Sequence, residues 1–148
     1  MNVSRSSLLP YSARQMYDVI ADVQSYPSFL NWCHGSEIVS KVDDEVIAKL
    51  LISYGALKFD FTTRNLMVEN QSVNISLVEG PFSLLRGKWQ LLSLSESACK
   101  VSLEMDFDFE SPIMQKLFGR VFQNVIAAQL DAFQKRAEQL YADSSSVS

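Results

Sequence analysis

The stretch from Glu37 to Glu110 constrains the fold most strongly, because it consists of apolar and β-branched runs separated by turn residues, with no helical period among them. Strands that follow one another without crossover helices cannot form a doubly wound parallel sheet. The stretch therefore predicts a meander of six antiparallel strands. The turn signals that divide it are Asp43-Asp44, Tyr54-Gly55, Glu69-Asn70-Gln71, Gly80-Pro81 and Glu96-Ser97-Ala98.

The last of these strands has one apolar and one polar face. Apolar and polar side chains alternate strictly from Lys100 to Glu110, which is typical of an antiparallel strand covered on one side. In the register expected for this hairpin, apolar residues face apolar ones and cations face carboxylates, so the parity of the pairing is better specified than its offset. A three-residue turn at 96–98 would pair Trp89 with Met105, Leu91 with Leu103, Lys88 with Asp106 and Arg86 with Asp108.

A strand over residues 2–9 and a helix over 13–22, with Ser12 as its N-cap, are predicted before the meander. Pro27 disfavours α geometry at the residue before it, so that helix is not expected to continue. Residues 27–32 are predicted as a short second helix or a tight loop. Their aromatic content is too high for a loop that only connects two elements.

One long helix is predicted after the meander. Ser111 is a good N-cap and Pro112 suits a first turn, and apolar positions recur at helical spacing as far as Tyr141. About 30 residues at about 1.5 Å each span roughly 45 Å, enough to cross a whole sheet. Residues 1–142 are therefore predicted to form a single domain, and the serine-rich residues 143–148 a disordered tail.

These elements predict an α+β fold in which a seven-stranded antiparallel curved sheet wraps around a long C-terminal helix, with two short helices after the first strand. Side chains, water or a ligand must fill the space between such a sheet and the helix. Residue types alone favour a solid core over a container, because an apolar stripe is more often packing. If a cavity exists, its predicted lining is Leu50, Phe59, Phe61, Ile75, Leu77, Trp89, Leu91, Leu103, Met105, Phe107, Leu117, Phe118, Val121, Phe122 and Val125.

Composition narrows the classes of function. The net charge of −4 argues against broad affinity for nucleic acid, and no DNA partner is expected. No window approaches about 18 consecutive apolar residues and the N-terminus lacks a secretory pattern, so a cytoplasmic location is expected. Two cysteines, Cys33 and Cys99, are too few for a disulfide framework and are expected to be buried small hydrophobes.

The sequence shows no motif for nucleophilic or metal-dependent catalysis. It has no glycine-rich phosphate loop, nucleophile elbow or HExxH helix. His34 adjoins Cys33, and neighbours on an extended chain point to opposite sides, so a metal site that also uses Cys99 is awkward to build. The carboxylates between Glu104 and Glu110 share the polar face of their strand, where a solvated surface is far commoner than a catalytic pair. The sequence therefore predicts neither an enzyme nor a metal site.

Two longer segments are unusual. Residues 20–33 read IADVQSYPSFLNWC, and residues 80–94 read GPFSLLRGKWQLLSL. With the opening Ser4-Arg5-Ser6, the segment 61–65 (FTTRN) and the final strand into Ser111-Pro112, they closely resemble the coenzyme Q-binding, START-like (polyketide cyclase/dehydrase-like) family over residues 3–141. The resemblance implies a helix-grip fold that holds ubiquinone or a related polyprenyl lipid as a bound ligand, without a catalytic cofactor.

Carried over by position, the resemblance also assigns the mouth of the cavity. Asn31 stands where the family usually has a second proline, so this part of the loop is expected to be looser. A purely structural role is the alternative for both segments, since the aromatic segment could simply plug the edge of the sheet and Gly80-Pro81 could be only a turn. The residues implied to form the gate or rim are Tyr26, Pro27, Phe29, Leu30, Trp32 and Cys33, with Gly80, Pro81 and Phe82 in a turn at the same mouth.

Three functions remain as hypotheses. The first is a non-enzymatic carrier of ubiquinone or a similar lipid that supports respiratory electron transport, with transient contact with the inner membrane or respiratory enzymes. The second follows from a ribosome-association subgroup of the family and is a toxin, of a toxin–antitoxin system, that binds the large ribosomal subunit and blocks subunit association. The third, a polyketide cyclase or aromatase, needs inward ionisable groups, for which Arg5, Tyr54 and Thr63 are the nearest candidates.

Overall fold

Seven antiparallel strands form one sheet in the order β1-β7-β6-β5-β4-β3-β2. The structure, a computed structural model, describes the backbone of residues 1–146 and the side chains of residues 1–142. From β2 onward each strand pairs with the next along the chain, and β1 pairs with β7. The predicted meander is confirmed. The strands are β1 (Asn2–Leu9), β2 (Cys33–Val42), β3 (Glu45–Tyr54), β4 (Leu57–Val68), β5 (Ser72–Glu79), β6 (Phe82–Ser95) and β7 (Ala98–Phe109).

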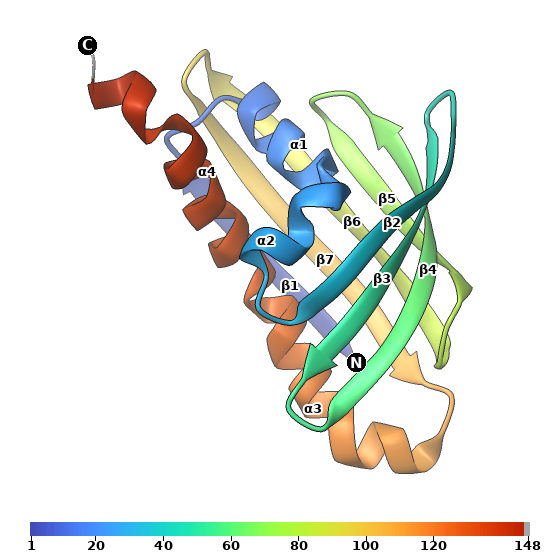
Figure 1. Cartoon of the computed structure of the whole chain (residues 1–148). Helices are drawn as coiled ribbons and strands as arrows, with labels where there is room; N and C mark the ends of the chain where they lie inside the picture. The colour runs from blue at the N-terminus through green and yellow to red at the C-terminus, as the bar shows by residue number, and fades with distance from the viewer. Residues whose placement is uncertain (147–148) are drawn as a thin grey trace.

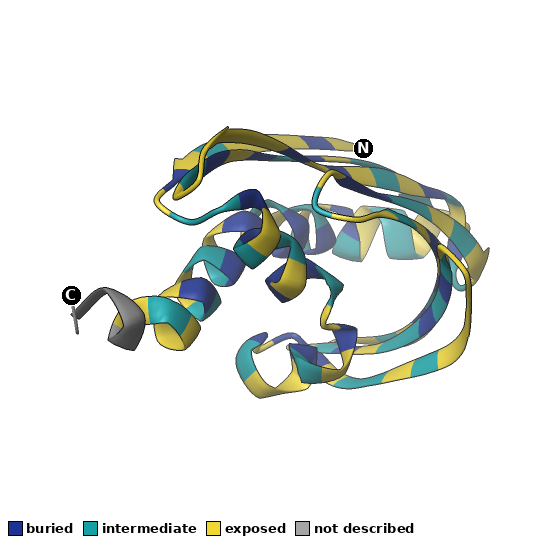
Figure 2. Cartoon of the chain, turned by 90° about the horizontal axis from the view of Figure 1, so that it is seen from above, coloured by how far each residue is buried: buried dark blue, intermediate teal, exposed yellow. Residues whose placement is uncertain are grey.

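The helices lie on the concave side of this sheet, which curves around them (Figures 1 and 2). The predicted single C-terminal helix is divided at Ala128, and no proline or glycine at that point explains the division. α4 continues to Ser146, into the segment expected to be a disordered tail, and residues 147–148 lie outside the described residues. The helices are α1 (Ala13–Ala21), the 3₁₀ turn η1 (Val23–Ser25), α2 (Tyr26–Phe29), α3 (Pro112–Ala127) and α4 (Gln129–Ser146).

Local sequence sets where the helices begin. The Ser12 hydroxyl accepts from Gln15 N at 3.1 Å while Gln15 Oε1 accepts from Ser12 N at 2.9 Å, a reciprocal capping box. Ser111 caps α3 as predicted. Tyr26, in contrast, adopts α geometry (φ −51°, ψ −45°) although Pro27 follows it. Pro27 lies in the first turn of α2, where its missing N–H removes no intrahelical bond.

The register of the β6–β7 hairpin has the predicted parity and a different offset. Trp89 lies opposite Leu103 and Arg86 opposite Asp106, two residues from the predicted partners. The difference arises because Ser95 pairs with Ala98 across a tighter turn, and the ladder shifts register between Ser93 and Ser95. Parity survives because only an even shift keeps the apolar side chains on the buried face.

Gly80 is the glycine that the fold requires most strictly. Its φ is +155°, and a Cβ added there would lie 2.7 Å from Phe61 Cβ, an atom too close to the backbone to move aside. We expect Gly80→Ala to lower the free energy of unfolding by about 2–4 kcal/mol, measured by urea denaturation, because steric overlap adds to backbone strain. Gly55→Ala is the matched control, since Gly55 (φ +62°) has open space around it and should show only strain of about 1–2 kcal/mol. Equal losses would contradict the steric explanation.

Candidate functional site

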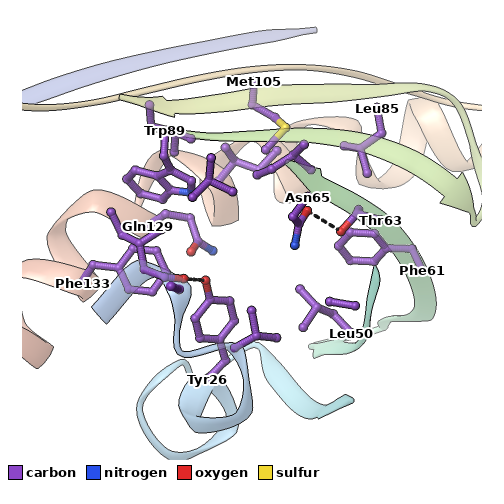
Figure 3. A pocket seen from close by; sticks show the side chains of 18 of the residues that line it. Tyr26, Leu50, Phe61, Thr63, Asn65, Leu85, Trp89, Met105, Gln129 and Phe133 are labelled. Atoms are coloured by element: carbon purple, nitrogen blue, oxygen red, sulfur yellow. Dashed lines mark hydrogen bonds between the residues drawn. The ribbon is translucent and has the colours of Figure 1, made fainter. Parts of the chain in front are cut away.

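A cavity of about 110 Å³ lies between the concave face of the sheet and the helices (Figure 3). About 10–15 Å³ of such space is enough for one water molecule, so this is larger than an ordinary packing defect. The container that residue types alone did not favour is therefore present. The lining consists of Ile20, Ala21, Val23, Tyr26, Trp32, Val46, Ala48, Leu50, Phe61, Thr63, Asn65, Met67, Val73, Ile75, Leu85, Trp89, Leu103, Met105, Phe122, Val125, Ile126, Gln129 and Phe133.

Strand periodicity explains why these residues meet. β3, β4, β5 and β7 each contribute every second residue, as expected for the inward face of a pleated sheet. On β6 the inward position between Leu85 and Trp89 is Gly87, and a Cβ there would meet the Met105 sulfur at 2.5 Å. The absence of a side chain at Gly87 therefore leaves room for Met105 beside the cavity.

The structure brings together about half of the predicted lining. The sheet residues were found by their alternation and the α3 residues by their helical spacing. Tyr26 and Trp32, predicted for the rim, line the cavity too. The predicted lining residues found in the cavity are Leu50, Phe61, Ile75, Trp89, Leu103, Met105, Phe122 and Val125.

The prediction for Leu117 is wrong, since its side chain is 62% exposed. It lies five positions before Phe122, which places the two side chains about 140° apart around α3. The other predicted lining residues are buried or half-buried in the core around the cavity rather than in its wall. They are Phe59, Leu77, Leu91, Phe107, Phe118 and Val121.

A cluster of phenylalanines closes one side of the cavity. Phe122 of α3 lies 4.9 Å from Phe107 and 6.4 Å from Phe61, both edge-on, and Phe82 stacks on Phe109 at 4.9 Å (ring centroids). Phe82 is buried inside this cluster and does not line the cavity. The turn at Gly80 and Pro81 thus packs its next residue into the core. This agrees with the alternative in which Gly80-Pro81 is only a turn.

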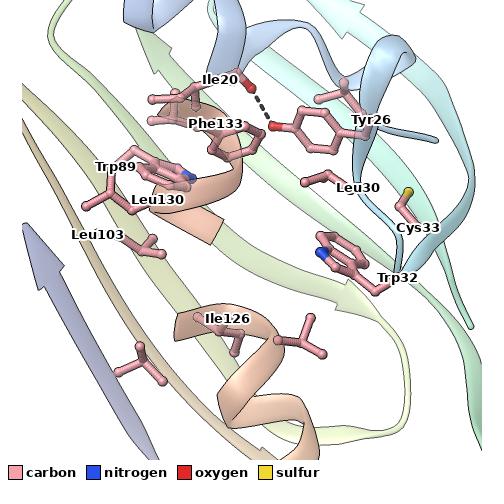
Figure 4. Packing of buried hydrophobic residues seen from close by; sticks show 14 of the residues in the cluster. Ile20, Tyr26, Leu30, Trp32, Cys33, Trp89, Leu103, Ile126, Leu130 and Phe133 are labelled. Carbon is pink, nitrogen blue, oxygen red and sulfur yellow. Dashed lines mark hydrogen bonds between the residues drawn. The ribbon is translucent and has the colours of Figure 1, made fainter. Parts of the chain in front are cut away.

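The segment from Tyr26 to Trp32 packs against α4, at a different set of rings (Figure 4). Tyr26 donates its hydroxyl hydrogen to the Ile20 carbonyl and lies 5.3 Å from the Phe133 ring. Phe29 contacts the same Phe133 ring at 5.7 Å. The two segments predicted to form the mouth, residues 26–32 and residues 80–82, therefore pack against different aromatic rings. Of the other residues predicted for the rim, Leu30, Trp32 and Cys33 are buried, Phe29 is half-buried and Pro27 is exposed.

The predicted lining was entirely apolar apart from the Trp89 indole, whereas the cavity also contains polar side chains, of which only Thr63 was considered from the sequence. The Thr63 hydroxyl donates to Asn65 Oδ1 at 3.0 Å, and both residues line the cavity. They continue the alternation that begins at Phe61, and Gln129 lies one helical turn beyond Val125, so extending either pattern would have found them. Of the groups considered for a cyclase, Arg5 and Tyr54 are exposed and only Thr63 points inward.

The electrostatics of the cavity are those of a neutral apolar site, because no lining residue carries a formal charge. Burial raises the pKa of the Tyr26 hydroxyl, and burial also raises the pKa of the neighbouring Cys33 thiol to about 11. Both groups are therefore protonated and neutral at physiological pH. Cys33 and Cys99 are free and buried, as predicted.

These raised pKa values predict a loss of stability in alkali. An unfolded thiol ionises near pH 8.5, whereas folded Cys33 ionises near pH 11, so deprotonation favours the unfolded chain as the pH rises between those values. We expect the free energy of unfolding, measured in urea from pH 8 to pH 11, to fall over that window. Cys33→Ala should show a shallower decline because it lacks the group that titrates, and a decline of unchanged slope would contradict this assignment.

Among residues 1–146, which the structure describes, no helix combines the length and the apolar character that a membrane span requires. Among the same residues, no three or more His, Cys, Asp or Glu side chains are grouped so that they could hold a metal ion. His34 is exposed on β2.

Comparison with known proteins gives the family. Residues 9–134 match the family described as polyketide cyclase / dehydrase and lipid transport. The ribosome association toxin RatA of Pseudomonas aeruginosa is 40% identical over 95% of this chain and 97% of its own. The coenzyme Q-binding protein COQ10 homolog B of Xenopus laevis is 28% identical over 93% of this chain and 58% of its own.

Solved structures show the same fold. The Zhui aromatase/cyclase from Streptomyces sp. R1128 superposes with a TM-score of 0.84 at 17% identity, over 94% of each chain. At that identity the likeness concerns the fold alone, which is the helix-grip arrangement of a curved seven-stranded sheet around a C-terminal helix. Since the family match covers residues 9–134 and the 40% identical relative spans nearly the whole chain, this protein belongs to the polyketide cyclase/dehydrase and lipid transport family, which is START-like in fold.

Proposed function

We propose that this protein is a non-enzymatic binding or carrier protein for ubiquinone or a related polyprenyl lipid, in support of respiratory electron transport. The observation that carries the proposal is the cavity of about 110 Å³, whose wall is apolar except for a few neutral polar groups. Such a wall suits an amphiphile with a compact polar head, because apolar burial provides affinity and the polar groups provide orientation.

The binding energy would come mainly from buried apolar surface, at roughly 25 cal/mol per Å² before ordering is subtracted. A polyprenyl tail is longer than the cavity, so its distal part must leave it. Phe118 and Val121 are half-buried and apolar, and they adjoin the lining residues Phe122 and Val125 on α3. The tail would leave between these two side chains and the Tyr26–Trp32 segment.

Further support comes from the family and from the chemistry of the wall. The family description includes lipid transport, and one relative is named a coenzyme Q-binding protein. A cyclase needs groups that transfer protons, whereas the only ionisable side chain among the lining residues is Tyr26, whose hydroxyl hydrogen is bonded to the Ile20 carbonyl. A binding role therefore agrees better with this wall than catalysis does.

The direct experiment is organic extraction of gently purified protein, followed by mass spectrometry of the extract. We expect ubiquinone or another polyprenyl lipid at a substantial fraction of one molecule per chain. The matched control is the Ala48→Phe variant, in which a ring occupies the cavity and the extract should contain much less lipid. A cavity that is repeatedly empty after expression in a quinone-producing host would overturn the proposal.

Ribosome association is the second candidate, and the observation that favours it is the 40% identity to a protein named ribosome association toxin RatA. By analogy this protein would bind the large ribosomal subunit and block subunit association. The outer face of the sheet gives less support, because Arg64 pairs with Glu45 (3.0 Å) and Arg86 with Asp106 (3.7 Å). Ribosome sedimentation profiles with and without excess protein test this role, and unchanged profiles would exclude it.

A further inference from the structure

Asn65 occupies an unusual position for a polar residue. It is the last residue of the segment 61–65 on β4, is 8% exposed and projects into the cavity (Figure 3). Its Oδ1 accepts the hydrogen of the Thr63 hydroxyl at 3.0 Å. That bond leaves the Nδ2 group, with two N–H donors, facing the cavity, and no hydrogen bond joins it to any other described residue.

Thr63 holds the oxygen end of the Asn65 amide. Thr63 is 5% exposed and adjoins Asn65 on the same face of β4. Because its hydroxyl hydrogen is directed to Asn65 Oδ1, the donor end rather than the acceptor end is available to a ligand. Thr63 is thus a positioning residue for the Asn65 amide.

The rest of the wall limits the charge of any ligand. Gln129 adds a neutral amide across the cavity, and no Asp, Glu, Lys, Arg or His is among the lining residues. A carboxylate or phosphate head would enter without a counter-charge, which is strongly unfavourable in an apolar site. A pure hydrocarbon would leave the Asn65 N–H groups buried and unpaired. An uncharged head with a strong acceptor oxygen avoids both penalties.

We infer that Asn65 is the specificity-determining residue of this cavity, and that it selects amphiphiles whose uncharged head carries a carbonyl oxygen able to accept from Asn65 Nδ2. The inference rests on the proposed function and narrows it to neutral carbonyl compounds, such as quinones, ketones and esters. It disfavours fatty acids and lipid phosphates as ligands.

The test compares three probes with alkyl chains of nine or ten carbons: decylubiquinone with a carbonyl head, decanoate with a carboxylate head, and decylbenzene with a hydrocarbon head. Binding is followed through the fluorescence of Trp32 and Trp89, which line the cavity. We expect the unsubstituted protein to prefer decylubiquinone to decanoate by at least about tenfold. Asn65→Leu should weaken decylubiquinone binding by roughly tenfold while changing decylbenzene binding less than about twofold.

Two further variants keep the test decisive. Leu66→Ala changes the next residue of β4, which is exposed and does not line the cavity, so it should leave the affinities for both neutral probes unchanged. Thr63→Val retains the Asn65 amide but removes the hydrogen bond that orients it, so it should lose part of the preference for decylubiquinone. This variant tests the inference even if Asn65→Leu folds poorly. Thermal melts establish that each variant is folded.

The outcomes separate the inference from the function on which it rests. If the neutral probes bind but Asn65→Leu affects decylubiquinone and decylbenzene equally, or affects neither, the inference is wrong and the binding function stands. If decanoate binds as well as decylubiquinone, the inference is also wrong. If no probe binds the folded, unsubstituted protein, the inference and the proposed function fail together.

Discussion

Phe133→Ala is expected to lower the free energy of unfolding by about 3–5 kcal/mol, the usual range for removing a buried phenylalanine ring. Phe133 is 1% exposed, and its ring lies 5.1 Å from the ring of Trp89, 5.3 Å from that of Tyr26 and 5.7 Å from that of Phe29. It therefore links α4 to the central sheet and to the segment that borders the cavity. Urea denaturation measures the loss.

The same variant should loosen one segment more than the rest. Amide hydrogen exchange over residues 23–32 should accelerate more than exchange in β6 and β7, because α2 loses the ring on which it packs. Leu140→Ala is the control on the same helix, since Leu140 is exposed and its truncation should change stability by no more than about 0.5 kcal/mol. A loss below about 1 kcal/mol for Phe133→Ala would show that the segment is held by other contacts.

Ala48→Phe is expected to abolish most ligand binding while leaving the fold nearly as stable. Ala48 is buried in β3 and lines the cavity, so an added ring enters empty space rather than packed side chains. A ligand head that loses about 100 Å² of buried surface loses about 2.5 kcal/mol, or roughly seventyfold in affinity. Tryptophan fluorescence titration with decylubiquinone measures the affinity, and urea denaturation measures the stability.

Val101→Phe is the matched control for this prediction. Val101 is fully buried in β7 and does not line the cavity, so overpacking there should cost about 1–3 kcal/mol of stability. Ala48→Phe should cost less than about 1 kcal/mol, because cavity filling offsets local strain. If the two variants are equally destabilised, the space beside Ala48 is not available to a ligand of this size.

Much of the fold could be predicted because its signals are local and periodic. Alternation from Lys100 to Glu110 and turn residues such as Asp43 and Asn70 depend on neighbours within a few positions, and both turn residues adopt positive φ in the structure. Helix starts at Ser12 and Ser111 were equally readable, because capping depends on residues within one turn.

Features that depend on how elements meet were predicted less well. The β6–β7 offset depended on a bulge at Ser93 and Ser95, which the apolar pattern does not register because a shift of two preserves it. Leu117 was assigned to the cavity because the apolar stripe of α3 is wider than its buried face. Asn65 was passed over, and Thr63 was considered only for a cyclase, because polar residues on an inward face are unfavourable unless they are hydrogen-bonded, and the bond between these two side chains cannot be seen in the sequence.

The sequence by itself determined the order of strands and helices, the parity of the sheet and the apolar character of its inner face, because these follow from spacing along one chain. Whether that inner face enclosed a solid core or a cavity was decided only by the tertiary structure. A void is the difference between the volume that the curved sheet and the helices on its concave side enclose and the volume that their side chains fill, and no single position encodes that difference. Here it leaves a space of about 110 Å³ with the Asn65 amide facing into it.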